Sequence, residues 1–253
     1  MIDLHCHIIP YIDDGAYSAH LACAMARHAR KSGVSAIVAT PHCDIGSRPN
    51  YRDREYFIVL GMFRALLKQT GIDITILPGA EIFVRPSDIR ELIEGNRLVT
   101  LNHSRYLLVE FPFDCSGKVI SQLLDTIAQC GLVPVVAHPE RYDAVQRKPQ
   151  LVARWFSQGY IIQVNKGSLL GRLGSGAALC SNHLLHHGLV HVIASDAHDM
   201  KYRPTGFQAL IPILEDQIGS EYLQLLLHTN PLRIISDQPI PAPNTSLPKE
   251  EFR

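Results

Sequence analysis

Several features of common protein classes are missing from this sequence. No apolar run approaches the roughly 18 residues that a membrane-spanning helix needs. The N-terminus has no basic stretch followed by an apolar core and a cleavage site. The six cysteines form no Cys-x-x-Cys pair; they are Cys6, Cys23, Cys43, Cys115, Cys130 and Cys180. We therefore expect a reduced, cytoplasmic protein without a membrane span.

An excess of charge of either sign is also absent. Lys and Arg together number 24, and Asp and Glu together number 24. No basic field therefore favours a nucleic acid, and no acidic tail suggests a solvating region. We expect no nucleic-acid partner, and we expect a local site to select the ligand.

A glycine-rich phosphate-binding turn is missing as well. The segment Gly171-Arg172-Leu173-Gly174-Ser175-Gly176 matches neither G-x-G-x-x-G nor a Walker loop. We interpret it as a flexible loop. Its mismatch weakens the case for an open, doubly wound sheet, which remains the alternative architecture.

The length of 253 residues suits one α/β barrel. A chain of this size buries roughly three quarters of its unfolded surface, so its core needs neither disulfides nor a structural metal. From Gln238 onward the chain holds four prolines and few apolar anchors. We therefore predict one domain over residues 1–237 and a flexible, Pro-rich tail over 238–253.

Apolar runs of strand length alternate with helical patterns along the chain. Seven such runs occur, at residues 1–7, 34–40, 74–77, 106–109, 133–137, 160–164 and 191–194. Helical patterns lie between and after them, at residues 18–33, 51–70, 86–94, 117–130, 149–157, 176–187 and 205–235. Continuous apolar strands that alternate with helices indicate a parallel sheet buried on both faces. Seven units favour a closed (β/α) barrel over an open sheet.

The first run ends in His5-Cys6-His7, which places two imidazoles on one face of a strand because side chains alternate with period two. Two neutral imidazoles at this spacing can hold one metal ion. Alone the pattern is weak, since two histidines near a strand end are more often surface or core residues. Cys6 and Cys43 should point to the opposite face of their strands and pack in the core.

Most of the other runs also end in metal-binding residue types. Six of the seven predicted strands end within a few residues in His, Glu or Asp: His5, His7, His42, Glu81, Glu110, His138, Asp196 and His198. The loop Asp13-Asp14-Gly15 adds carboxylates, although Asp-Gly is also a common turn pair. In a barrel these groups would meet at the mouth formed by the carboxyl ends of the strands. Five histidines and four carboxylates exceed one tetrahedral site and suit two or three ions.

These motifs, in this order, resemble the polymerase-and-histidinol-phosphatase (PHP) superfamily. The segments that carry the resemblance are His5-x-His7, Asp13-Asp14-Gly15, Pro41-His42, Gly79-Ala80-Glu81, Glu110, His138-x-Glu140-Arg141-Tyr142 and Ser195-Asp196-x-His198. Within the superfamily the sequence is similar to the manganese-dependent bacterial protein-tyrosine phosphatases that act on kinases controlling capsule and exopolysaccharide synthesis. The likeness runs to about Asp237 and includes Leu101–Tyr106, Gln163-Val164-Asn165 and Asn230-Pro231.

The resemblance implies a distorted seven-stranded (β/α) barrel of the PHP type with up to three divalent ions, expected to be Mn²⁺. By position, one ion would be held by His5, His7, Glu81 and Asp196. A second would be held by Glu81, Glu110 and His138, and a third by Asp14, His42 and His198. Arg141 and Arg203 match family arginines that are expected to bind the phosphoryl group.

The implied function is hydrolysis of phosphotyrosine by metal-hydroxide attack, on the tail of a tyrosine autokinase. A cysteine nucleophile is not expected, because no cysteine is followed by an arginine six positions later. Two alternatives stay open: a small-molecule phosphatase such as histidinol-phosphate phosphatase, and a non-catalytic metal-binding module. Four loop residues could line a deep slot for the substrate ring: Tyr17, Arg48, Tyr51 and Tyr202.

Overall fold

The computed structural model describes residues 1–44, 54–85 and 89–241. Its strands are β1 Ile2–Cys6, β2 Ala36–Ala39, β3 His42–Cys43, β4 Thr75–Pro78, β5 Glu81–Phe83, β6 Tyr106–Glu110, β7 Val133–Ala137, β8 Ile161–Asn165 and β9 Val192–Ala194. Its α-helices are α1 Ala19–Lys31, α2 Arg54–Gln69, α3 Ile89–Glu94, α4 Gly117–Gln129, α5 Asp143–Arg147, α6 Gln150–Ser157, α7 Lys166–Leu169, α8 Ser175–His186, α9 Ile211–Ile218, α10 Ser220–Gln224 and α11 Asn230–Ile235. Short turns of other helix types complete it: η1 Leu101–His103, η2 Pro139–Arg141 and η3 Leu225–Thr229.

The described strands form two parallel sheets, with the orders β1-β2-β4 and β3-β5-β6-β7-β8-β9. The α/β class and the parallel pairing agree with the prediction, and each of the seven apolar runs overlaps a strand. One closed ring of seven strands is not what the described residues form. Proline interrupts the runs, since Pro41 lies between β2 and β3 and Pro78 ends β4. The short strands β3 and β5, which the sequence did not predict, resume pairing in the second sheet.

Backbone hydrogen bonds join the two sheets at the carboxyl ends of their strands. Asp196 N–H donates to the His5 carbonyl over 2.8 Å, and His7 N–H donates to the Ala197 carbonyl over 2.9 Å. The chain after β9 therefore lies directly beside the end of β1. This junction brings the first and last predicted ligand motifs together.

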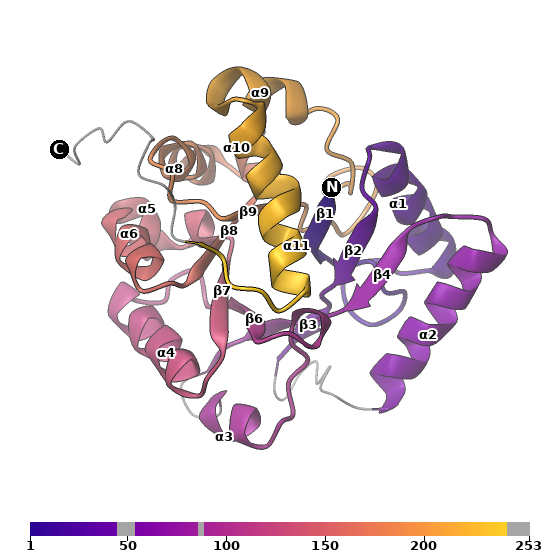
Figure 1. The fold of residues 1–253 in the computed structure, drawn as a ribbon, viewed down its shortest axis with the longest axis horizontal. Coiled ribbons are helices and arrows are strands. Elements are labelled where there is room, and N and C mark those ends of the chain that lie inside the picture. The colour runs from indigo at the N-terminus through magenta and orange to yellow at the C-terminus, as the bar shows by residue number, and fades with distance from the viewer. Residues whose placement is uncertain (45–53, 86–88, 242–253) are drawn as a thin grey trace.

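Helices surround the strands, and α11 lies across them in Figure 1. One apolar cluster combines strand residues from both sheets with α11, including Leu4, Val38, Leu108, Val135 and Ile234. A second and larger cluster fills the space between the strands and the surrounding helices. The strands are thus buried on both faces, as their continuous apolar runs predicted.

Local sequence explains where α1 begins and ends. The Ser18 side chain accepts a hydrogen bond from Leu21 N–H, which makes it the N-cap. Gly33 follows the helix with a φ of 88°, the left-handed conformation that commonly ends helices. The buried face consists of Ala22, Cys23, Met25, Ala26 and Ala29. Small alanines on this face let α1 lie close to the strands.

Some predicted boundaries change. The helical pattern predicted over 205–235 is divided, because Gly219 takes a φ of 76° between α9 and α10. The predicted loop 171–176 is partly helical, since Ser175 and Gly176 open α8. The predicted tail lies mostly outside the described residues, as do the predicted starts of two helices, so these stay predictions. No described helix is both long and apolar enough to cross a bilayer.

Candidate metal centre

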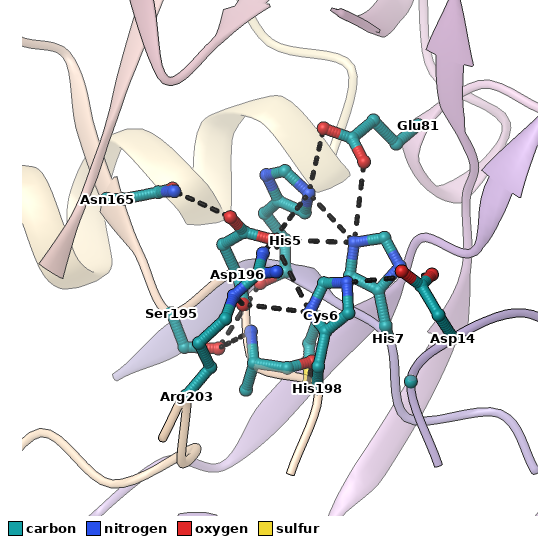
Figure 2. Close-up of polar contacts among 12 residues, drawn as sticks. His5, Cys6, His7, Asp14, Glu81, Asn165, Ser195, Asp196, His198 and Arg203 are labelled. Carbon is teal, nitrogen blue, oxygen red and sulfur yellow. Dashed lines mark hydrogen bonds and ion pairs between the residues drawn. The ribbon is translucent and has the colours of Figure 1, made fainter. Parts of the chain in front are cut away.

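The carboxyl ends of the strands hold a cluster of histidines and carboxylates, all buried except the exposed Asp14 and the partly exposed His42 (Figure 2). The structure brings together all nine ligands predicted from the sequence. Their donor atoms form four groups, within each of which all atoms lie within 4.8 Å of one another: His5, His7 and Glu81; His5, His138 and Asp196; His42, Glu81 and Glu110; and His7, Asp14, His42 and His198. Because the groups share members, the arrangement is one continuous centre.

Glu81, the first residue of β5, lies in the middle of this cluster. Its Oε1 is 2.9 Å from His138 Nε2 and 3.2 Å from His5 Nε2. Its Oε2 is 2.9 Å from His42 Nδ1 and 3.4 Å from His7 Nε2. Each carboxylate oxygen therefore faces a different pair of imidazoles. This geometry suits a carboxylate that bridges two ions.

Asp196 reaches the same cluster from the loop after β9. Its Oδ1 is 3.5 Å from both His5 Nε2 and His7 Nε2. Its backbone has a φ of 48°, which a residue other than glycine adopts at some cost. The hydrogen bond from its N–H to the His5 carbonyl holds this conformation. The left-handed turn directs the carboxylate back toward β1.

His42 joins two of the groups that the resemblance kept apart. Its Nε2 is 3.5 Å from Asp14 Oδ1, in the set predicted for the third ion. Its Nδ1 is 3.7 Å from Glu110 Oε2, in the set predicted for the second ion. Within that second set, His138 Nε2 lies 3.5 Å from Glu110 Oε1 as well as 2.9 Å from Glu81 Oε1. The geometry thus places His42 between the two predicted sets.

The group of His7, Asp14, His42 and His198 provides a direct test of whether a cation fits. His198 Nδ1 lies 3.1 Å from the Asp196 carbonyl, so this nitrogen carries the proton and donates it. Its Nε2 then carries a lone pair. That nitrogen is buried without a hydrogen-bond partner among the described residues, and Asp14 Oδ1 lies 3.9 Å away. A bound cation would satisfy it, with the carbonyl in the supporting position that is usual for a ligating histidine.

Asp13, which the sequence placed in a motif without a role, orients His7. Its Oδ2 lies 2.7 Å from His7 Nδ1 and also accepts the His42 backbone N–H over 3.0 Å. The loop can approach this closely because Gly15 has no side chain: a Cβ there would lie 2.1 Å from the His7 carbonyl oxygen. His7 therefore presents Nε2 to the cluster.

Two amides on β8 orient His5 and Asp196, and their role was also not predicted. Gln163 Nε2 donates to Asn165 Oδ1 over 2.9 Å, and Asn165 Nδ2 donates to Asp196 Oδ2 over 2.6 Å. Gln163 Oε1 is then left to accept from His5 Nδ1 over 2.9 Å. Hence His5 carries a proton at Nδ1 and turns Nε2 toward Glu81, where a cation could take the place of a second proton. The available signal was Gln-x-Asn at the end of β8, which corresponds to the one predicted strand without a His, Asp or Glu near its end.

Electrostatics in the cluster show that it is suited to positive ions. Burial by itself would raise the pKa of Glu81, but the adjacent His5, His138 and His42 hold this pKa well below its usual value. Burial opposes protonation of His7, but hydrogen bonds that its ring donates to Asp13, Asp196 and Glu81 raise its pKa well above normal. Protons on imidazoles thus balance the carboxylates. Divalent cations can replace those protons, which is how metal binding is coupled to pH.

Glu110 lacks that compensation. Burial, followed by repulsion from Glu81 and Asp196, raises the pKa of Glu110 to about 8. A carboxyl that is protonated in the absence of cations would release its proton when a cation binds beside it. Glu110 is therefore a carboxyl whose proton a bound cation would displace.

Both predicted arginines contact Asp196 at the edge of the cluster. Arg203 donates from Nε to the Asp196 carbonyl over 3.0 Å and approaches Oδ1 with its terminal nitrogen over 2.5 Å. Arg141 NH1 lies 3.5 Å from Asp196 Oδ2, and the guanidinium stands 4.4 Å from the centroid of the Phe113 ring. Both side chains are partly exposed. They therefore place positive charge between the buried donors and the solvent.

Other predictions on this region have different outcomes. Cys6 and Cys43 are fully buried and belong to the apolar core, as predicted. Tyr17 and Tyr202 are largely exposed. Arg48 and Tyr51 lie outside the described residues. The predicted slot around these four residues therefore stays a prediction.

The chain is similar to proteins of capsule synthesis. The family model for capsular polysaccharide synthesis proteins, CpsB/CapC, matches residues 1–236. This chain belongs to that family. Tyrosine-protein phosphatase YwqE of Bacillus subtilis is 35% identical over 240 residues, which cover 95% of this chain and 93% of the relative. Tyrosine-protein phosphatase CpsB of Streptococcus pneumoniae is 34% identical over 245 residues, which cover 94% and 99% of the two chains.

Solved structures support the same relationship. A chain from the crystal structures of YwqE from Bacillus subtilis and CpsB from Streptococcus pneumoniae, described as metal-dependent tyrosine phosphatases, matches with a TM-score of 0.86 at 34% identity. The match covers 95% of this chain and 96% of that one. The lactonase Lmo2620 from Listeria monocytogenes matches with a TM-score of 0.62 at 11% identity, which shows a shared fold alone. The resemblance drawn from the motifs is thus confirmed at the level of the family.

Proposed function

We propose that this protein is a metal-dependent phosphotyrosine protein phosphatase. The observation that carries the proposal is the position of Asp196, which lies against the predicted ligands His5 and His7 on one side and the two arginines on the other. A centre for cations thus adjoins a pair of guanidinium groups. Hydrolysis of a phosphate monoester needs this combination, because negative charge must be neutralised while a nucleophile is supplied.

We assign three ions to the cluster, with the ligand sets that the resemblance implies. The first set is His5, His7, Glu81 and Asp196; the second is Glu81, Glu110 and His138; the third is Asp14, His42 and His198. The mixture of imidazoles and carboxylates suits Mn²⁺. When bound, divalent cations supply a water of lowered pKa and positive charge for the phosphoryl oxygens. The buried contacts of Glu81 with four imidazoles support its role as the bridge.

The protein's own groups prepare this chemistry. Asp13 and Gln163 each hold a proton on the Nδ1 of a histidine, so that Nε2 of His7 and of His5 is available to a cation. Arg141 and Arg203 bind the phosphoryl oxygens with planar, charge-assisted hydrogen bonds. The phenol of a tyrosyl phosphate leaves with a pKa near 10, so departure depends less on a general acid than departure of an alkyl alcohol does.

For the substrate we propose a tyrosine-phosphorylated protein, the tail of a tyrosine autokinase that controls capsule or exopolysaccharide synthesis. Support comes from the relatives, which are named tyrosine-protein phosphatases, and from the family's place in capsular polysaccharide synthesis. A histidinol-phosphate phosphatase would use the same ligands and is not favoured by these relatives. We further propose a single domain over 1–237 in a distorted barrel, a flexible tail over 238–253 and a cytoplasmic location.

The decisive experiment compares kcat/KM on matched substrates with Mn²⁺ present. We expect rapid hydrolysis of a phosphotyrosine peptide and much slower hydrolysis of phosphoserine and phosphothreonine peptides and of histidinol phosphate. Glu81→Gln, which keeps the shape of the side chain and removes its charge, serves as the inactive control. A preference for histidinol phosphate would overturn the protein-phosphatase assignment and leave the metal centre standing.

A further inference from the structure

Lys166, the residue directly after β8, carries a buried ammonium group outside the predicted ligand set. Its side chain is 2% exposed. Among the described residues no carboxylate lies within ion-pair distance of its nitrogen, and burial lowers the pKa of the ammonium to about 8. A buried charge is costly unless hydrogen bonds compensate it. Its partners therefore indicate what the charge is for.

Those partners are backbone carbonyls of the loop that follows Arg203. Lys166 Nζ donates to the Pro204 carbonyl and to the Gly206 carbonyl, the latter over 2.6 Å. The ammonium also stands 4.8 Å from the centroid of the buried Phe207 ring. The end of β8 is thus tied to a segment about 40 residues further along the chain.

Helix α1 holds the same segment from another side. Gly206 N–H donates to His28 Nδ1 over 3.1 Å, and the Thr205 hydroxyl donates to the Met25 carbonyl over 2.8 Å. Thr205 is fully buried between these contacts. Pro204 to Gly206 therefore has little freedom to move. The residue just before it is Arg203.

The loop before Arg203 is held by contacts within itself and, at its start, by the bond from His7 N–H to the Ala197 carbonyl. The Asp199 carboxylate accepts from the backbone N–H groups of Lys201 and Tyr202, each over 2.6 Å. The Arg203 carbonyl accepts from His198 N–H over 3.0 Å. These bonds fix the shape of the loop. Anchorage of the loop to the rest of the protein beyond Arg203 comes from Lys166 and α1.

We propose that Lys166 is a positioning residue for the phosphoryl-binding Arg203. By donating hydrogen bonds to the Pro204 and Gly206 carbonyls, it holds the Arg203 guanidinium beside Asp196. This inference rests on the proposed function, in which Arg203 binds phosphate. Lys166 touches neither the substrate nor a cation in this scheme. Its contribution reaches the reaction through Arg203 alone, so removing Arg203 should also remove the effect of Lys166.

The test is a double-mutant cycle of Lys166→Met and Arg203→Ala in the Mn²⁺-loaded protein. Met keeps much of the volume of the lysine side chain and removes its donors. We expect Lys166→Met to lower kcat/KM on a phosphotyrosine peptide between about tenfold and about 100-fold, since small displacements of a binding group have effects of this size. Inorganic phosphate, as a competitive inhibitor, should bind correspondingly more weakly. Bound manganese should stay at the wild-type level.

In the Arg203→Ala background, Lys166→Met should change phosphate inhibition less than about twofold, because deletions of residues that act as a unit are not additive. Lys201→Met is the matched control, since this exposed lysine lies in the same loop. It should behave as wild type. Equal losses in both backgrounds, or no loss in either, would overturn the proposal.

Three further variants keep the test decisive if Lys166→Met does not fold. Lys166→Arg keeps a cation that can donate to two carbonyls and should retain most of the phosphate affinity, whereas His28→Leu removes the opposite anchor and should weaken it. Wild-type affinity in His28→Leu together with wild-type affinity in a folded Lys166→Gln protein would overturn the proposal. If wild-type protein fails to hydrolyse phosphotyrosine, the proposed function falls, and phosphate binding measured by calorimetry still tests the positioning role.

Discussion

The two ends of the strands use opposite charges in different ways. At the carboxyl ends, Glu81 and Asp196 are almost completely buried and lie among imidazoles and guanidinium groups. At the amino ends, Asp237 pairs with Arg105 over 2.9 Å while about half of each side chain remains exposed. Water screens the exposed pair, so it contributes little. Burial of the Glu81 and Asp196 carboxylates costs free energy of folding. The proposed catalytic role of the site accounts for that cost.

Left-handed backbone conformations occur at both ends of the strands. His138 with a φ of 32° and Asp196 with 48° lie at the carboxyl ends, and Asn102 with 50°, His103 with 60° and Asp237 with 54° lie at the amino ends. Asn, Asp and His are the residues other than glycine that adopt this conformation most often. The two ends differ in what the conformation serves. At His138 it places the ring within 2.9 Å of Glu81, and at Asn102 it accompanies a side-chain hydrogen bond to the Ile235 carbonyl.

Removal of metal should have the largest effect, and this effect should be confined to the carboxyl ends of the strands. Chelation should abolish phosphatase activity while the far-UV circular dichroism spectrum stays near that of the loaded protein, because the two apolar cores do not include the ligands. Loss of bound ions should lower Tm by mass action. Mn²⁺ should restore activity best. Full activity in protein shown by elemental analysis to be free of metal would contradict the assignment, and complete unfolding on chelation would show that the ions are structural.

Loss of one of the two arginines should have the next largest effect on activity. Arg203→Ala and Arg141→Ala should each lower kcat by about 100-fold, the size seen when one preorganised charge donor is removed from an active site. Metal content should stay near normal because neither residue is a predicted ligand. Steady-state kinetics with elemental analysis of the same samples would check this. Arg105→Ala, which changes an arginine at the amino ends of the strands, is the control and should leave kcat and metal content unchanged. Unchanged kinetics in Arg203→Ala would count against the phosphoryl-binding role.

Loss of the Gln163 side chain, which together with Asn165 orients His5 and Asp196, should have a smaller effect. This effect should be on metal binding. Gln163→Leu removes the acceptor for His5 Nδ1 and the donor to Asn165. We expect the affinity for Mn²⁺ to fall between about tenfold and about 100-fold, as is typical for groups behind a ligand. Titration with Mn²⁺, followed by activity, would measure it. At saturating Mn²⁺ most activity should return; a loss that saturation does not repair would point to a role other than orienting His5.

The clustering of the predicted ligands could be foreseen from the sequence and the role of Gln163 and Asn165 could not, for a physical reason. Ligand types stand out in a sequence because His, Glu and Asp at successive strand ends are uncommon without a site, and parallel strands bring their carboxyl ends to one edge. Gln163 and Asn165 became meaningful only when the structure placed them between His5 and Asp196. Similarly, β3 and β5 are too short to show a period. Lys166 would be taken for an exposed lysine from sequence alone.

At the amino ends, Asn102 should affect stability and leave activity unchanged. Its side chain donates to the Ile235 carbonyl over 2.9 Å, which ties η1 to the end of α11. Asn102→Ala loses this bond and must adopt a left-handed backbone, which should cost about 2 kcal/mol of unfolding free energy. Asn102→Gly relieves the strain and loses only the bond, so it should cost less. Denaturant unfolding would measure both. A fall in kcat/KM in either folded variant would show that the two ends are coupled.

The smallest effect concerns His191, which shows how a buried histidine behaves without carboxylates around it. Its Nδ1 accepts from Ile162 N–H over 3.1 Å, its ring stacks on Phe156 at 4.2 Å, and burial lowers its pKa to about 4. His191 therefore stays neutral in the folded protein at pH values where the same imidazole in the unfolded chain, with its usual pKa near 6.5, is protonated. Stability should fall as the pH falls from 6.5 toward 4 and level off below.

Between pH 7.5 and pH 6 this linkage amounts to about 1 kcal/mol. His191→Asn keeps an acceptor near the same position and cannot be protonated, so its unfolding free energy should fall less over that interval, whatever packing it loses at both pH values. His7 is buried equally but is surrounded by carboxylates that raise its pKa, so its contribution has the opposite sign and cancels between the two proteins. Denaturant unfolding of both at each pH gives the difference. Parallel pH dependence in wild type and His191→Asn would mean that His191 is not held neutral.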